Sequence, residues 1–164
     1  MEDEIIEKLS ANFKEGRGGF LPKAFVIHVT EGKFSSSTAW CLDPKSKVSY
    51  HFIIRENGEI WQLVETENTA WHAGLAVKPT WKGHTIGRNP NLETIGIAFA
   101  GFAAKGPTLA QILAIRKLIL KYSAIHRIPL DRKNIIGHNE IRADKVCPGA
   151  NANIDAILYF AQLQ

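Results

Sequence analysis

Cysteine is scarce in this chain of 164 residues, which contains only Cys41 and Cys147. Two cysteines are too few for the disulfide framework of a small secreted domain, and a reducing compartment would keep both as thiols. A disulfide between them stays open as the less favoured alternative. We therefore expect free thiols that are available for chemistry.

Long apolar runs are also missing, because no stretch approaches the ~20 residues that a membrane span needs. The start of the chain, "MEDEIIEKLS", has neither the basic nor the apolar segment of a signal peptide. We expect a protein made in the cytoplasm without a signal peptide and without membrane insertion. There is no internal repeat or linker, so the length and the 45% hydrophobic content predict a single domain over residues 1–164.

Lys and Arg form no dominant run, although they outnumber Asp and Glu and give a net charge of +4. The excess favours an anionic partner such as nucleic acid, anionic lipid or bacterial cell wall. Because the basic residues are scattered and no RNA-binding aromatic motif is present, we expect no nucleic acid partner.

The first half of the chain contains a helical pattern followed by strand patterns. Apolar spacing predicts a helix over residues 3–14, within an N-terminal helix and connecting loop over residues 1–20. "KAFVIHVT" predicts a central strand, and "SSSTAWCL" a serine-capped helix that packs Trp40 and Cys41 against the sheet. Strands near 49–55 and 59–64 flank "NG", which favours a type I′ hairpin.

The second half predicts one more strand and two helices. "TIGIAFAGF" reads as a buried strand, and a capping box begins a helix with one apolar face: Leu109, Ile112, Ile115, Ile119 and Tyr122. A last helix begins at about Asn153. The long loop 73–92 is expected to be functional. Together these elements predict an α/β fold with a mixed central sheet.

Three separated residues suggest a metal site: His28 in an apolar strand, His138 after a glycine, and Cys147 in "DKVCPG". Two histidines and a thiolate are a recurrent ligand set for catalytic zinc, which keeps a fourth position open. Taken singly, each residue has an ordinary structural explanation, such as a hydrogen-bonded core histidine. Residue types and spacing alone do not decide between these readings.

Six motifs in order supply stronger evidence: "VIHVTEG", "YHFIIRENGEIWQLV", "AWHAG", "NLETIGIAF", "QILAIRKLI" and "GHNEIRADKVCPG". Over residues 22–162 the chain resembles the zinc-dependent N-acetylmuramoyl-L-alanine amidases, a family that includes phage lysozyme-type amidases and peptidoglycan recognition proteins. The resemblance implies a mixed, mostly parallel sheet with helices on both sides. It also implies hydrolysis of the amide between N-acetylmuramic acid and L-alanine in peptidoglycan.

The resemblance assigns roles to individual residues of this chain. It makes His28, His138 and Cys147 the ligands of a single zinc ion, and Lys145 and Tyr50 the catalytic residues. Three residues of "AWHAG" match positions that line the substrate groove: Trp71, His72 and Gly74. The implied partner is peptidoglycan or a muropeptide, and the implied setting is a phage endolysin or a bacterial autolysin that acts on the cell wall after release or lysis. The oligomeric state is not indicated.

Strand alternation separates two neighbouring candidates, because Tyr50 and His51 point to opposite faces of an extended strand. Tyr50 should share a face with Phe52 and Ile54, and His51 with Ile53 and Arg55. Both side chains should therefore not reach the metal. We favour His51 as a packed histidine that supports the site.

One position departs from the family pattern. Other branches carry a glutamate general base directly after the "IGI" run, where this chain has Ala98. Either Tyr50 and the metal suffice, or the protein is a non-catalytic peptidoglycan-binding module. Retention of Cys147 favours the enzyme, because recognition proteins without activity typically lose that ligand. A structural zinc domain with another partner is a second alternative.

Overall fold

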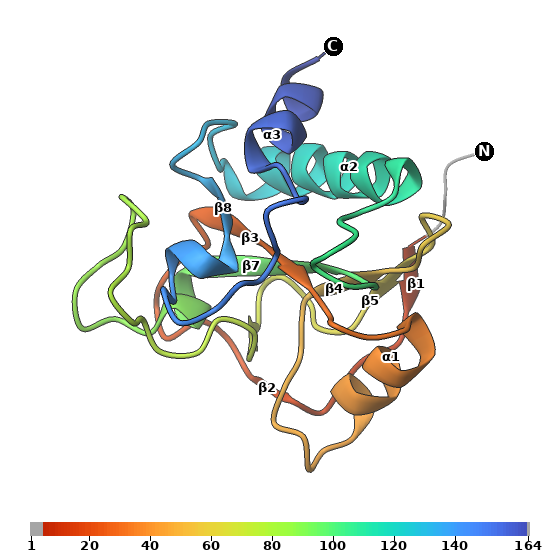
Figure 1. The fold of residues 1–164 in the computed structure, drawn as a ribbon. Helices are drawn as coiled ribbons and strands as arrows, with labels where there is room; N and C mark the ends of the chain where they lie inside the picture. Colours follow the sequence, from red (N-terminus) through yellow and green to blue (C-terminus); the bar gives the residue numbers. More distant parts are fainter. Residues whose placement is uncertain (1–4, 164) are drawn as a thin grey trace.

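The computed structural model describes residues 5–163, and a six-stranded sheet forms its centre (Figure 1). Within this sheet β4 and β5 pair in antiparallel fashion, and the other neighbouring strands are parallel. This confirms the predicted mixed, mostly parallel sheet. The strands follow one another across the sheet as β1 (Ile5–Glu7), β5 (Ile60–Gln62), β4 (Phe52–Ile54), β7 (Thr94–Phe99), β3 (Ala24–Val29) and β8 (Ile135–Gly137).

The two longest strands are neighbours in the interior of the sheet and are buried along their whole length. β3 and β7 read "AFVIHV" and "TIGIAF", and every residue of both is buried. Continuous runs of this kind, rich in Val and Ile, are expected where both faces of a sheet are covered. The predictions of a central strand for the first segment and a buried strand for the second are confirmed.

Helices cover both faces of the sheet (Figure 1). α2 (Leu109–His126) and α3 (Ile154–Gln162) pack against one face and enclose the largest apolar cluster with Phe25, Ile27 and Ile97. The shorter α1 (Phe34–Leu42) contacts the other face, where Phe34 and Cys41 meet Ile53 and Ala98.

The start of α2 and most of its buried face were predicted correctly. Thr108 and Gln111 form the capping box. Ile115, Ile119 and Tyr122 are buried as expected, but Leu109, the first helical residue, is 64% exposed. α3 begins directly after Asn153, close to the expected start of the last helix, and the Asn153 side chain caps it by accepting from Ala156 N–H.

The predicted N-terminal helix over residues 3–14 is wrong, although positions 3 and 4 lie outside the described residues. Ile5–Glu7 instead form β1, which extends the sheet beside β5, and Phe13–Lys14 form β2, which pairs with β6 (Thr69–Ala70). An open sheet edge offers backbone partners to the β-branched pair Ile5 and Ile6, and this pairing outweighs a weak helical pattern.

Two local details also differ from prediction. In the β4–β5 hairpin only Gly58 of the "NG" pair has a positive φ, 93°. Gly58 N–H donates to Arg55 C=O, so the loop is a turn followed by a left-handed glycine and not type I′. α1 begins after Lys33 without a side-chain cap, and Trp40 is 57% exposed, whereas Cys41 is buried as expected.

The long loop over residues 73–92 contains little regular structure but is attached to the segment after β8. Val77 N–H donates to Ile141 C=O, Ala143 N–H donates to Val77 C=O, and Trp81 N–H donates to Glu140 C=O. The loop ends in a short 3₁₀ helix, η1 (Pro90–Glu93), which leads into β7. These bonds bring "AWHAG" next to the end of β8.

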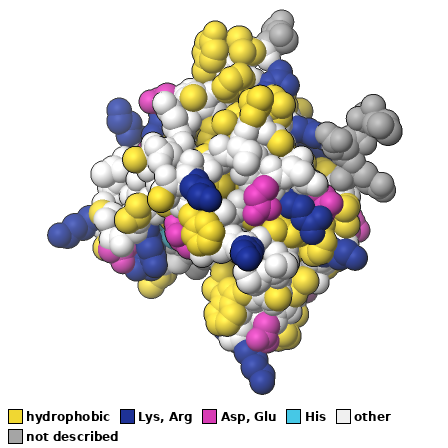
Figure 2. Space-filling view, turned by 45° about the vertical axis from the view of Figure 1, so that its right-hand side comes forward, with side chains coloured by type: hydrophobic (Ala, Val, Ile, Leu, Met, Phe, Trp, Pro, Cys, Tyr) yellow, Lys and Arg dark blue, Asp and Glu magenta, His cyan; other side chains and the backbone are white. Residues whose placement is uncertain are grey.

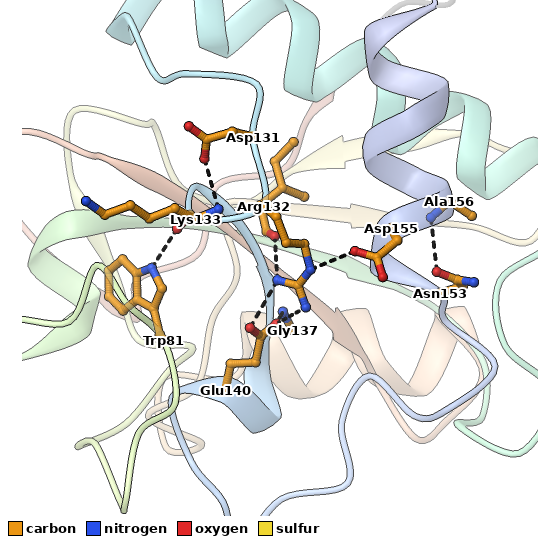
Figure 3. Close-up of polar contacts among 10 residues, drawn as sticks. Trp81, Asp131, Arg132, Lys133, Gly137, Glu140, Asn153, Asp155 and Ala156 are labelled. Carbon is orange, nitrogen blue, oxygen red and sulfur yellow. Dashed lines mark hydrogen bonds and ion pairs between the residues drawn. The ribbon is translucent and has the colours of Figure 1, made fainter.

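An ion-pair network holds the turn that follows β8 (Figure 3). Glu140 accepts from both terminal nitrogens of Arg132, at 3.0 and 2.9 Å, and from Gly137 N–H at 2.8 Å. Arg132 also reaches Asp155 at the start of α3, 3.0 Å away. The short helix η2 (His138–Glu140) is thereby fixed relative to β8 and α3.

Basic side chains are spread over the face seen in Figure 2 and are interspersed with Asp and Glu. This face therefore carries no single basic patch, in line with the scatter in the sequence. Among residues 5–163, no helix combines the length and the apolar character that crossing a membrane requires.

Candidate metal centre

Side chains of His28, His138 and Cys147 meet beyond the carboxyl ends of two adjacent parallel strands. His28 is the fifth residue of β3, and His138 follows the last residue of β8. One ligand atom from each of the three residues lies within 4.8 Å of the other two. The fold thus brings together three residues that are 110 and nine positions apart in sequence.

Each ring presents a defined nitrogen to this cluster. His28 Nδ1 lies 3.7 Å from Cys147 Sγ, while its Nε2 lies 3.0 Å from His72 Nδ1. His138 Nε2 donates to the carbonyl oxygen of Ala73, 3.0 Å away, which leaves the Nδ1 lone pair of His138 free. Metal-binding histidines typically donate their other ring N–H in this way.

Burial keeps the histidines neutral. It lowers the pKa of His28 well below its ordinary value, and the neighbouring His138 lowers it further. Burial also lowers the pKa of His138 and raises that of the Cys147 thiol to about 11. Two neutral imidazoles and one thiol form a donor set that suits zinc, because the metal replaces the thiol proton.

Tyr50 lies beside the cluster, with its ring centroid 5.1 Å from that of His28. The detailed face assignment was wrong, because Tyr50 packs with the Ile53 cluster and not with Phe52 and Ile54. β4 begins only at Phe52, so strict alternation does not extend back to Tyr50. Burial raises the pKa of the Tyr50 phenol, which makes it a hydrogen-bond donor and not a base.

His51 points away from the ligand cluster and is fully buried. Its Nδ1 accepts from Gly96 N–H at 2.9 Å, and its Nε2 lies 3.2 Å from Asn68 C=O. Arg17 packs beside the same ring nitrogen, 2.9 Å away. The expectation that Tyr50 and His51 do not both approach the metal ligands agrees with this arrangement.

Lys145 is exposed on the loop that carries Cys147. Burial has the largest effect on the pKa of Cys147 and on that of His138. The positive charge of Lys145 has a smaller effect and lowers both pKa values. The ammonium group is thus close enough to act electrostatically on the cluster. Its catalytic role stays a prediction.

Residues of "AWHAG" occupy three different environments. Trp71 is half-buried, and Lys47 Nζ lies 5.9 Å from its ring centroid. Gly74 is exposed with φ 65°, and a Cβ there would lie 2.9 Å from Arg142 Nη1. His72 is only 7% exposed. The assignment of these residues to a substrate groove stays a prediction.

Ala98 is the register partner of His28 on the adjacent strand β7. Partners in a parallel pair point to the same face, so a glutamate at this position would stand beside His28. Ala98 is fully buried in an apolar cluster with Phe34 and Ile53. This chain therefore has a methyl group and not a carboxylate beside His28.

Sequence reasoning missed Glu31 as a neighbour of the cluster and treated His72 only as a candidate for the substrate groove. His72 Nδ1 lies 3.0 Å from His28 Nε2, and its ring occupies the space above Gly96, a position that a strand pattern alone does not distinguish. Glu31 has a positive φ of 53°. Burial is the largest cause of the raised pKa of Cys147, and the negative charge of Glu31 raises that pKa further. Both residues carried a sequence signal, since His72 lies in "AWHAG" and Glu31 lies two residues after the strand that carries His28.

Comparison with known proteins places this chain in a family. Residues 19–150 match the family model described as N-acetylmuramoyl-L-alanine amidase. The amidase AmiD of Escherichia coli (strain K12) is 35% identical over 137 residues, which cover 73% of this chain and 45% of that protein. Amidase A of Achromobacter lyticus is 35% identical over 82 residues, 49% of this chain and 38% of that protein.

Solved structures agree in fold. A crystal structure of an AmpD derivative has a TM-score of 0.78 at 22% identity, and the match covers 99% of this chain and 96% of that one. The E. coli AmiD structure in complex with anhydro-N-acetylmuramic acid-L-Ala-D-gamma-Glu-L-Lys has a TM-score of 0.71 at 29% identity, covering 85% and 57%.

The fold and the three convergent ligand atoms define an α/β protein with a candidate three-ligand metal centre. The chain belongs to the N-acetylmuramoyl-L-alanine amidase family, because the family model matches most of its length. The chain spans between 38% and 51% of the length of the curated relatives that it matches.

Proposed function

We propose that this protein is a zinc hydrolase that cleaves the amide between N-acetylmuramic acid and L-alanine in peptidoglycan. The observation that carries the proposal is the convergence of His28, His138 and Cys147 within 4.8 Å in a chain of the amidase family. When bound, zinc lowers the pKa of a water ligand to about 7 and polarises the carbonyl of the amide.

The chain's own residues would supply the remaining chemistry. The imidazoles of His28 and His138 and the thiolate of Cys147 would hold the metal as three protein ligands, a number typical of catalytic zinc sites. Attack on an amide creates an oxyanion, which Lys145 and the phenol of Tyr50 stabilise as hydrogen-bond donors. Trp71 and Gly74 would contact the muramyl peptide. An endolysin or autolysin has this activity.

A second candidate function is peptidoglycan binding without cleavage. Ala98 favours it, because this position next to His28 lacks a carboxylate that would act as a base. The retained ligand Cys147 favours the enzyme, because binding a wall fragment does not require a complete three-ligand site. The two functions differ in whether new amino groups appear.

The test is digestion of purified peptidoglycan with the zinc-loaded protein, followed by mass spectrometry of the soluble products. We expect free stem peptides that begin with L-alanine and glycan strands with intact lactyl groups. Treatment with a chelator should stop the reaction, and added zinc should restore it. Binding to the sacculus without release of peptides would favour the binding module.

Lys145→Ala should retain zinc but lower kcat by about two orders of magnitude, the size expected for loss of one group that stabilises an oxyanion. Lys121→Ala is the matched control, because Lys121 is an exposed lysine on α2, which packs on the opposite face of the sheet. Steady-state kinetics with zinc content measured in each variant gives the comparison. Equal kcat in the two variants would make Lys145 an ordinary surface residue.

A further inference from the structure

His72 is enclosed by the protein and does not face an open groove. The residue is 7% exposed, and its ring lies over Gly96 on β7. A Cβ at position 96 would lie 2.5 Å from His72 Cγ, so only glycine leaves room for the ring. Gly96 stands next to Ala98 on the same face of the sheet, and this places His72 beside His28.

Hydrogen bonds around His72 form a directed series. The single hydroxyl proton of Thr94 is donated to Pro90 C=O, 2.8 Å away. The same Thr94 oxygen lies 3.3 Å from His72 Nε2, where it acts as the acceptor. His72 therefore carries its proton on Nε2, and its Nδ1 presents a lone pair.

That lone pair faces the metal centre. His72 Nδ1 lies 3.0 Å from His28 Nε2, so His28 is the donor of this bond and carries its proton on Nε2. A neutral imidazole has one N–H, and the Nδ1 of His28 is then left with a free lone pair. This is the nitrogen that lies 3.7 Å from Cys147 Sγ.

The opposite arrangement does not suit a metal site. If His72 were protonated on Nδ1, it would donate to His28, and His28 would carry its proton on Nδ1. That proton would occupy the position in which a metal ligand must have a lone pair. His72 Nε2 would then be unprotonated and could not donate to the Thr94 oxygen. The Thr94 hydroxyl could not donate to His72 in return, because its proton is already donated to Pro90 C=O.

We propose that His72 is a positioning residue that holds His28 in the tautomer and orientation required of a metal ligand, and that it is not a substrate contact. The inference rests on the proposed zinc site. His72 acts only through His28, and the series Pro90, Thr94 and His72 connects that ligand to the backbone at the start of β7.

The test compares two variants of similar shape. His72→Leu removes the acceptor, whereas His72→Asn retains one, because the amide oxygen branches from Cγ as Nδ1 does. His72→Leu should bind Zn²⁺ roughly 10- to 100-fold more weakly, the usual effect of losing a partner of a metal-binding histidine, and His72→Asn should recover much of the loss. Competition with a chromophoric chelator measures the affinity.

His126→Leu serves as the control for loss of a partly buried imidazole, because His126 contacts the Thr66 hydroxyl and none of the three ligands. It should leave Zn²⁺ affinity unchanged. A substrate contact at His72 predicts a different result, in which KM rises while Zn²⁺ affinity stays the same in His72→Leu. That result would overturn the inference.

Ring ¹⁵N NMR of the wild-type protein gives a readout that does not depend on whether a variant folds. In the Zn²⁺-loaded protein we expect His72 to be protonated on Nε2 with an unprotonated Nδ1, and His28 to be protonated on Nε2. Protonation of His72 on Nδ1 would refute the inference. Failure of the wild type to bind Zn²⁺ would instead refute the proposed function, so the two failures are distinguishable.

Discussion

Cys147→Ala is expected to abolish both metal binding and hydrolysis. The substitution removes the only sulfur of the candidate centre and leaves His28 and His138, and two imidazoles alone are a poor site for zinc. The fold should survive, because Cys147 is half-buried in a loop and only borders the large apolar cluster. Zinc content by elemental analysis and release of stem peptides from peptidoglycan are the two measurements.

Cys41→Ala is the matched control for this experiment. Cys41 is 1% exposed in α1 and packs with Ile53, so its loss should cost roughly 1 kcal/mol of stability, the typical size for a buried substitution. It should keep a full complement of zinc. Full zinc occupancy in Cys147→Ala would show that the ligand assignment is wrong.

The parts of the fold that sequence predicted well are those where local pattern and burial agree. β3 and β7 are continuous apolar runs in the middle of the sheet, and α2 has a capping box at its start. Their local preferences and their tertiary contacts favour the same structure. The prediction for the N-terminal segment was wrong because local pattern and tertiary contacts disagree there. The pairing of β1 with β5 outweighed a helical spacing of apolar residues.

The sequence predicted which residues form the candidate site but not the contacts that these residues make with their neighbours. His28, His138 and Cys147 were identified by residue type and by the order of the family motifs, and the structure brings them together. The contact between His72 and His28 depends on the space above Gly96, which no residue pattern reveals. Hydrogen-bond direction likewise follows from three-dimensional neighbours such as Thr94.

The missing carboxylate at Ala98 makes Tyr50 the side chain on which catalysis is expected to depend most after the ligands. The centroid of its ring lies 5.1 Å from that of His28, and the ring packs against the apolar cluster that contains Phe34 and Cys41 of α1. Burial raises its pKa above the ordinary value of 10, so the phenol remains a donor at neutral pH. Its expected task is a hydrogen bond to the attacking water or to the developing oxyanion.

Tyr50→Phe should therefore keep the fold and the zinc while kcat falls by roughly one to three orders of magnitude. The aromatic ring that packs with Ile53 is retained, and only the hydroxyl is lost. KM should change little if the bond forms mainly in the transition state. Kinetics and zinc content are measured on the same preparation, so that a loss of metal is not mistaken for a loss of chemistry.

His51→Ala is the comparison that makes this result specific, because the two residues are adjacent in sequence but differ in surroundings. Removal of the His51 ring leaves Gly96 N–H and Asn68 C=O without their partner, at about 1–3 kcal/mol for each buried group. A lower melting temperature is therefore expected, with turnover retained in the fraction that is folded and holds zinc. Near-normal turnover in Tyr50→Phe, together with a folded, zinc-loaded and inactive His51→Ala, would show that His51 and not Tyr50 serves the reaction.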